Sequence, residues 1–155
     1  MKIVCFTGHR DITWEERQIL SPKLMREIEK AARQGADTFR SGGARGVDTL
    51  AAIAVLQYKK EHPNIRLELF LTCPDQPARW PIEDQRLYQK ILRRADRVQY
   101  IASEYFDGIY QLRDQALVKG ADLCISYLRS SKGGTAYTCA CAMREGVDWI
   151  NLAES

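Results

Sequence analysis

Histidine is scarce in this sequence, and the five cysteines are not spaced as metal ligands usually are. Only His9 and His62 are present, and the five cysteines form no C-x-x-C pair. The two nearest cysteines, Cys139 and Cys141, stand in a helical pattern in which positions i and i+2 do not face each other. Because zinc sites take His and Cys ligands at short, regular spacings, we expect no metal site. The odd number of cysteines likewise indicates no disulfide framework.

Long hydrophobic runs and a charge excess are also missing. No apolar stretch approaches the roughly 20 residues that a membrane helix needs, and the one in the N-terminal MKIVCFTGHR is too short for a signal peptide. The net charge is only +3, from 23 basic and 20 acidic residues, which is too balanced to indicate nucleic-acid binding. We therefore expect a cytoplasmic protein without membrane contact, and we do not expect nucleic acid as its partner.

Short apolar runs alternate with helical patterns along the whole chain. The runs at 2–7, 38–41, 65–72, 97–102 and 123–128 are typical of strands, and DWIN at 148–151 is a short further candidate. Amphipathic helical patterns fill the intervals, after Thr13 and at 47–58, 87–92, 109–116 and 135–145. This alternation predicts an α/β fold, a Rossmann-like three-layer α/β/α sandwich with a mostly parallel sheet of five or six strands. We expect residues 1–155 to form a single domain.

Local signals mark several helix ends. Thr13 and Glu16 match a capping box, whereas Ser21-Pro22 predicts that the helix carrying Leu20, Leu24, Ile28 and Ala31 is interrupted or restarted. The fragments QGAD (34–37), KGAD (119–122) and EGVD (145–148) each place a glycine where a helix should end and a strand begin.

Three glycine-containing turns follow predicted strands. They are Gly8-His9-Arg10 after the first strand, Gly42-Gly43-Ala44-Arg45-Gly46 after the second and Gly133-Gly134-Thr135 after the fifth. Because parallel strands end at one edge of a sheet and at least two turns open helices, free N–H groups should converge on one crevice. Each turn alone is better explained as a tight connection between a strand and a helix, but their convergence favours phosphate binding.

Charged residues near these turns have two interpretations each. Arg10 and Arg45 would either bind phosphate oxygens or form surface salt bridges. Asp48, in the first turn of the second helix, suits the helix dipole; as a ligand-binding residue it would contact ribose hydroxyls, because a carboxylate repels phosphate. Arg113 would approach the same crevice or pair with Asp114 on the helix surface.

The long loop after the third strand offers two residues for base recognition. Gln76 would hydrogen-bond a base and Trp80 would stack on it, although Trp80 is equally suited to packing as a lid.

Five segments resemble the SLOG superfamily in identity and order: CFTGHR, SGGARGVD, PDQPARW, LRDQALVKGADLCISY and GGTAYT. Over almost its whole length the chain is most similar to the YpsA-like branch of small bacterial proteins. The superfamily also holds DprA and the LOG phosphoribohydrolases, which activate cytokinins. The resemblance implies a Rossmann-like fold and a nucleotide-related ligand, held by Gly8, Arg10, Gly42, Gly43, Gly46, Asp48, Gly133, Gly134 and Thr135.

One departure bears on catalysis. The phosphoribohydrolase branch has a catalytic glutamate three residues after the threonine of its glycine motif, and here that place is Thr138. A carboxyl from Glu83, Asp84 or Asp114 could replace it from elsewhere in the crevice. We assign no catalytic residue and expect a non-catalytic protein that binds or senses NAD, ADP-ribose or another adenine nucleotide.

Two alternatives stay open beside this expectation. One is a LOG-like nucleoside-monophosphate phosphoribohydrolase, which would hydrolyse an N-glycosidic bond. The other is DprA-like single-stranded DNA binding through Tyr105, Phe106 and Tyr110, against which the neighbouring Glu104 and Asp107 argue. Because relatives in the superfamily often self-associate, a homo-oligomer is also possible.

Overall fold

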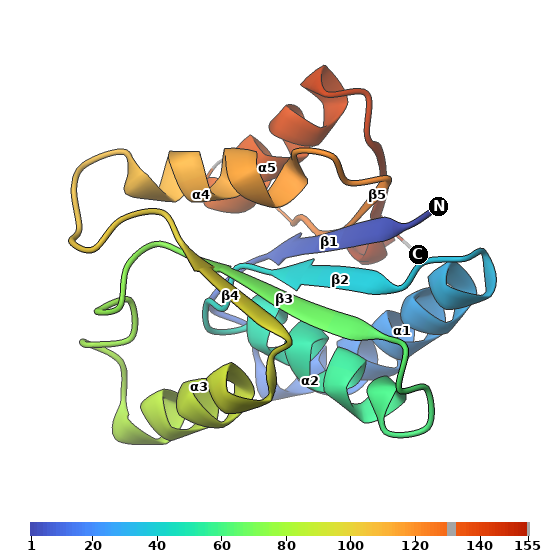
Figure 1. Ribbon diagram of the computed structural model, residues 1–155, viewed down its shortest axis with the longest axis horizontal. Coiled ribbons are helices and arrows are strands. Elements are labelled where there is room, and N and C mark those ends of the chain that lie inside the picture. The colour runs from blue at the N-terminus through green and yellow to red at the C-terminus, as the bar shows by residue number, and fades with distance from the viewer. Residues whose placement is uncertain (130–132, 155) are drawn as a thin grey trace.

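Over the described residues, 1–129 and 133–154, six parallel strands form one sheet with helices on both faces (Figure 1). In this computed structural model the strands are β1 (Ile3–Gly8), β2 (Thr38–Ser41), β3 (Arg66–Leu71), β4 (Arg97–Tyr100), β5 (Leu123–Tyr127) and β6 (Asp148–Asn151). The helices are α1 (Trp14–Arg33), α2 (Val47–Lys59), α3 (Ile82–Arg94), α4 (Ile109–Val118), α5 (Gly134–Arg144) and a terminal 3₁₀ turn, Leu152–Glu154. The predicted Rossmann-like α/β fold is confirmed.

The strand order is β4-β3-β2-β1-β5-β6, so the direction of winding reverses between β1 and β5. Helices α1, α2 and α3 cover one face of the sheet, and α4 and α5 cover the other (Figure 1). The turns after β1 and β5 therefore flank the switch point, which is where open α/β sheets bind their ligands.

The centre of the sheet is apolar on both faces. Val4, Cys5 and Phe6 of β1 are completely buried, as expected of an unbroken apolar run between two helix layers. The Phe6 ring stacks near that of Phe39 from β2, with ring centroids 6.1 Å apart. This packing makes the middle of the sheet a rigid base for the turns at its carboxyl edge.

Helix α1 begins as expected but is not interrupted. The Thr13 hydroxyl accepts the Glu16 N–H and the Glu16 carboxylate accepts the Thr13 N–H, which confirms the capping box. The predicted break at Ser21-Pro22 is wrong, because one helix runs from Trp14 to Arg33. Pro22 lies on the exposed side, where water can satisfy the carbonyl that its missing N–H leaves free. The buried face carrying Leu20 and Leu24 continues past it.

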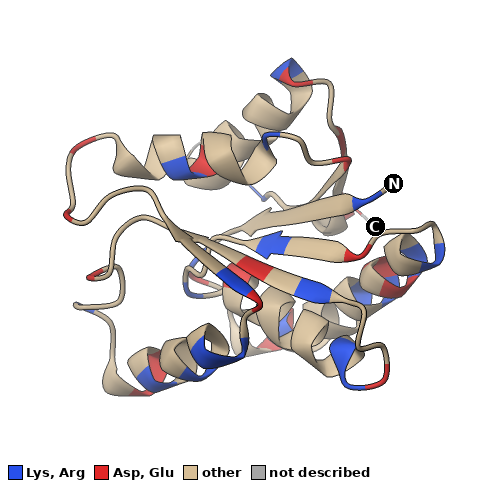
Figure 2. Cartoon of the chain, viewed as in Figure 1, with Lys and Arg blue, Asp and Glu red and all other residues tan. Residues whose placement is uncertain are grey.

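Helices α1 to α4 carry charges of both signs. Figure 2 shows basic and acidic positions mixed along α1, whereas in α3 the acidic positions come first and the basic ones follow, and the loop between β4 and α4 carries acidic positions only. Among the described residues, no helix combines the length and apolarity that crossing a membrane requires.

Two turns at the carboxyl edge touch through their backbones. A Cβ at Gly8 would overlap the Val47 side chain, and a Cβ at Gly46 would overlap the carbonyl oxygens of His9 and Arg10. The Val47 N–H donates to the His9 carbonyl at 3.2 Å. The turn after β1 and the start of α2 are therefore in direct contact. Only glycine at positions 8 and 46 leaves room for this contact.

We expect Gly46→Ala to lower the free energy of unfolding by about 3 kcal/mol, through a positive φ and backbone overlap together. Gly120→Ala is the matched control, because Gly120 has the same φ of +77° but no heavy atom within 4 Å of the added Cβ. For that variant we expect a loss of about 1 kcal/mol. Urea unfolding measures both, and equal losses would mean that the backbone contact at Gly46 adds nothing to the cost of its φ.

Candidate functional site

A cavity of about 350 Å³ lies at the switch point, between the turns after β1 and β5 and the helices α2, α4 and α5. Eight of the residues predicted from the sequence line it: Gly8, His9, Arg10, Ala44, Asp48, Arg113, Gly134 and Thr135. The cavity is also lined by residues that the sequence did not predict as ligand-binding, namely Thr7, Asp11, Tyr110, Asp114, Leu117, Arg129 and Thr138.

The loop Gly42–Gly46 forms the structural support behind this cavity. Its Gly43 N–H donates to the Ser41 hydroxyl at 3.1 Å, and its Ala44 N–H donates to the Asp48 carboxylate at 3.2 Å. Of the loop, only Ala44 lines the cavity. These donors serve the fold, and direct ligand contact by Gly42, Gly43 or Gly46 stays a prediction.

The Gly42 carbonyl oxygen ties this loop to two distant elements. It accepts hydrogen bonds from Arg113 of α4 at 2.6 Å and from the Gln76 amide at 3.1 Å. The Gln76 side-chain oxygen in turn accepts the Thr72 N–H at 2.9 Å. Both ends of the Gln76 amide are therefore bonded within the protein, so this buried side chain fixes the loop after β3 against the loop after β2.

Arg45 and Trp80 lie away from the cavity. Arg45 forms an ion pair of 3.2 Å with Asp84 of α3, which matches the salt-bridge alternative. The Trp80 ring packs edge-on against Tyr88, with centroids 5.4 Å apart. Together with Gln76, Trp80 lines a neighbouring cavity instead. A ligand contact by Arg45 or Trp80 stays a prediction.

The start of α5 opens into the cavity. Gly133 is the N-cap, and the first N–H with an acceptor is that of Tyr137, which bonds the Gly133 carbonyl at 3.1 Å. Among the described residues, none accepts the N–H groups of Gly134, Thr135 or Ala136. A Cβ at Gly133 or Gly134 would meet no heavy atom of the described residues within 4 Å. Unpaired N–H groups, a positive helix end and open space together suit an anion.

Two buried carboxyls flank Arg113 inside the cavity. The Arg113 guanidinium donates from Nε to Asp114 Oδ1 at 2.9 Å. Burial raises the pKa of Asp48 to about 6, because the charged form loses its hydration, and Arg113 opposes this shift. Burial also raises the pKa of Asp114, again against Arg113 and against a hydrogen bond with Thr138. With a pKa of about 6, the Asp48 carboxyl can exchange protons with a ligand near neutral pH.

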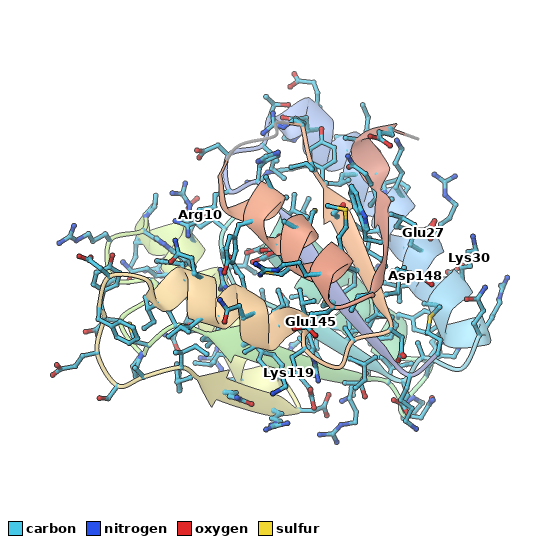
Figure 3. All side chains as sticks on the ribbon, turned by 90° about the horizontal axis from the view of Figure 1, so that it is seen from above. Arg10, Glu27, Lys30, Lys119, Glu145 and Asp148 are labelled. Carbon is cyan, nitrogen blue, oxygen red and sulfur yellow. The ribbon has the colours of Figure 1, made fainter. Side chains whose placement is uncertain are left out.

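A cationic wall faces these acids. The Arg10 guanidinium lies 4.7 Å from the centre of the Tyr110 ring, and that of Arg113 lies 5.5 Å from it. Arg10 is exposed, and Figure 3 labels it close to the start of α4. No ion pair involves Arg10 within the part of the chain that the structure describes. Its charge is therefore available to a ligand at the mouth of the cavity.

His9 and Arg129 fasten the two turns at the switch point. The Arg129 N–H donates to His9 Nε2 at 2.9 Å, and its guanidinium donates to the Asp11 carbonyl at 2.8 Å. Burial, and then the Arg129 charge, lower the pKa of His9, so the neutral ring that accepts this bond is favoured. Arg129 belongs to no motif; its only sequence signal is its place directly after the fifth strand.

Comparison with known proteins places the chain among bacterial relatives. The YspA SLOG family profile matches residues 4–148. A UPF0398 protein from Brevibacillus brevis is 26% identical over 122 residues, covering 77% of this chain and 65% of that protein. A UPF0398 protein from Oceanobacillus iheyensis is 26% identical over 147 residues, covering 88% of this chain and 79% of that protein. The chain thus spans a little under two thirds of the Brevibacillus relative.

Two solved structures share the fold. DNA processing protein A from Helicobacter pylori, described for its single-stranded DNA binding mode, gives a TM-score of 0.65 at 21% identity, over 95% of this chain and 63% of that one. DprA from Streptococcus pneumoniae gives 0.63 at 21% identity, over 94% and 48%. Identity this low shows the fold alone. The expectation about nucleic acid, which was drawn from net charge, therefore stays a prediction.

We expect Asp48→Asn to flatten the pH dependence of stability. Because the folded state raises the pKa of Asp48 from 3.8 to about 6, this group stabilises the fold below pH 3.8 and loses that contribution as the pH rises through 6. The variant should therefore gain up to about 3 kcal/mol on the wild type between pH 4 and pH 7. Its amide oxygen can still accept the Ala44 N–H. Urea unfolding at each pH tests this, and a gain that does not vary with pH would contradict it.

Proposed function

Because this chain belongs to the YspA SLOG family, we propose that it binds or senses a nucleotide or nucleotide derivative, with a phosphate at the start of α5. The observation that carries the proposal is the first turn of α5, whose N–H groups have no acceptor among the described residues and open into a cavity at the switch point of the sheet. A helix N-terminus of this kind is a ready site for a phosphate.

The surroundings of α5 support a phosphate ligand. Because no heavy atom of the described residues would lie within 4 Å of a Cβ at Gly133 or Gly134, phosphate oxygens can approach the backbone closely. Arg10 stands at the rim of the same cavity without an ion pair among the described residues and can donate to the phosphate.

The cavity is larger than a bare phosphate needs, and its other walls suit a sugar. The carboxyls of Asp48 and Asp114 accept hydrogen bonds, which is how acidic residues recognise ribose hydroxyls. Tyr110 and Leu117 add apolar surface. AMP, ADP-ribose and NAD combine phosphate, ribose and an aromatic base, and they are therefore the ligands to test first.

A second candidate is N-glycosidic hydrolysis of a nucleotide. The catalytic glutamate of LOG-like phosphoribohydrolases corresponds to Thr138 here, and the Asp114 carboxyl from α4 reaches a hydrogen bond with Thr138. Glu83 and Asp84 instead lie in the first turn of α3, outside the cavity. Asp114 is thus the one of the three considered carboxyls that could act on a ligand there.

We expect Arg10→Ala to weaken AMP and ADP-ribose binding by about tenfold, because it removes a charge-assisted hydrogen bond to phosphate. Isothermal titration calorimetry measures the affinity. Arg93→Ala, which removes an equal charge from exposed α3, is the control and should leave it within twofold. Absence of binding by the wild-type protein to every phosphate-containing nucleotide tested would refute the proposed function.

If the second candidate is correct, the wild-type protein releases free adenine from AMP and Asp114→Asn slows this release by about a hundredfold. Chromatography of the reaction mixture detects the base. AMP affinity of the variant should stay within about threefold, which separates lost chemistry from lost binding. Bound AMP that is never hydrolysed by the wild type would eliminate this candidate and leave nucleotide binding intact.

A further inference from the structure

A groove of about 400 Å³ runs between helices α2 and α3, away from the cavity at the switch point. Its apolar side chains are Ile53 and Leu56 from α2 and Leu87 and Ile91 from α3. Ile53 is exposed, although it stands between buried positions of its helix. Apolar side chains that meet in an open groove are typical of a surface that another molecule covers.

The rim of this groove is basic. It is formed by Lys60, directly after α2, and by Lys90 and Arg94 of α3, and none of the described residues that line the groove is acidic. None of these three cations has an ion-pair partner among the described residues. A second copy that presented the same groove would bring like charges together. The groove therefore suits an apolar segment that is flanked by acids.

Three segments of this chain combine an exposed apolar side chain with two acids, and they are residues 14–16, 82–84 and 104–107. In the first, Glu16 already forms an ion pair of 3.1 Å with Arg129. In the second, Asp84 forms an ion pair of 3.2 Å with Arg45. In the third, neither acid has an ion-pair partner among the described residues. Both acids of 104–107 are thus available to the cations of another molecule.

The segment 104–107 is also placed to reach another molecule. It belongs to the loop between β4 and α4, which projects at the carboxyl edge of the sheet (Figure 1) and carries acidic positions only (Figure 2). Tyr105 is 62% exposed and Phe106 is 42% exposed. Tyr105 lines the neighbouring cavity of its own chain, whereas Phe106 does not. Phe106 is therefore suited to be the apolar anchor of a contact, with an acid on either side.

From this complementarity we propose that the groove between α2 and α3 binds the 104–107 loop of a second copy of this chain. The second copy's Phe106 fills the apolar groove, and its Glu104 and Asp107 face the basic rim. This inference goes beyond the proposed function and does not depend on it, because the groove shares no lining residue with the cavity at the switch point.

A two-fold dimer accounts for both the size and the direction of this contact. One loop in one groove is small, because specific interfaces ordinarily bury more than about 1,000 Å². A two-fold axis makes the same contact twice. Lys60 and Arg94 lie at the carboxyl ends of their helices, hence toward the amino edge of the sheet, and the loop lies at the opposite edge. An axis perpendicular to the strands brings these two edges of the two copies side by side.

Analytical ultracentrifugation of the wild-type protein at increasing concentration is the first test. We expect a dimer with a micromolar Kd that weakens as salt rises, because charges contribute to the contact. Phe106→Ala should weaken the dimer at least tenfold by removing the anchor. Trp14→Ala is the matched control, because Trp14 is also an exposed aromatic residue beside two acids. It should leave Kd within twofold.

Charge reversal tests whether the loop and the groove are partners. Lys90→Glu should weaken the dimer at least tenfold, whereas Arg93→Glu, exposed on the same helix but outside the groove, should leave Kd within threefold. Glu104→Lys combined with Asp107→Lys should also weaken it. Adding Lys60→Glu and Lys90→Glu to that loop variant should restore Kd to within about threefold of the wild type, a rescue that misfolding cannot produce.

The opposite results are distinct. A monomer at every concentration, even at low salt, would overturn the proposal and leave the groove to an acidic segment of another protein. A dimer that Phe106→Ala and Lys90→Glu leave unchanged would overturn it by placing the interface elsewhere. Loss of the dimer in Trp14→Ala alone would place the interface at the start of α1. Failure of the combined charge reversal to restore the dimer would contradict direct pairing of the loop with the groove.

Discussion

The backbone contact between the turn after β1 and the start of α2 is the constraint on which the cavity depends. The His9 carbonyl accepts the Val47 N–H, and it occupies the space that any side chain at Gly46 would need. Gly8 makes the matching approach to the side chain of Val47. Because two turns from neighbouring strands are in contact here, the wall that carries Ala44 and Asp48 is fixed against the turn after β1.

This constraint divides the glycines into two functional groups. Those of the β1 and β2 turns make close packing possible, and the N–H groups of Gly43 and Ala44 are consumed within the fold. Gly133 and Gly134, in contrast, stand in open space at a helix start whose N–H groups have no acceptor among the described residues. A phosphate gains most where donors are unpaired, which is why we propose the anion site at α5 rather than at the more glycine-rich loop.

Arg113 links the loop Gly42–Gly46 to the buried carboxyls of the cavity. From α4 it reaches the Gly42 carbonyl and the Asp114 carboxyl, so one buried cation joins the second turn to the far helix layer. Its presence limits the rise in the pKa of Asp48 and Asp114 that burial causes. The cavity consequently combines the start of α5, where we propose that an anion binds, with the buried acids Asp48 and Asp114.

The sequence by itself determined the order and type of the elements, the capping box of α1 and the convergence of three turns on one edge, because periodicity, capping and turn chemistry act within a few residues. It misjudged Pro22, whose cost the packing of α1 offsets. Only the tertiary structure decided that Arg45 pairs with α3, that Gln76 braces a loop, and that Arg129 and Asp114 enter the cavity. Those outcomes depend on which residues, distant in sequence, come close enough to share a hydrogen-bond donor and on which of them are buried away from water. The order of the strands in the sheet determines which residues are brought together.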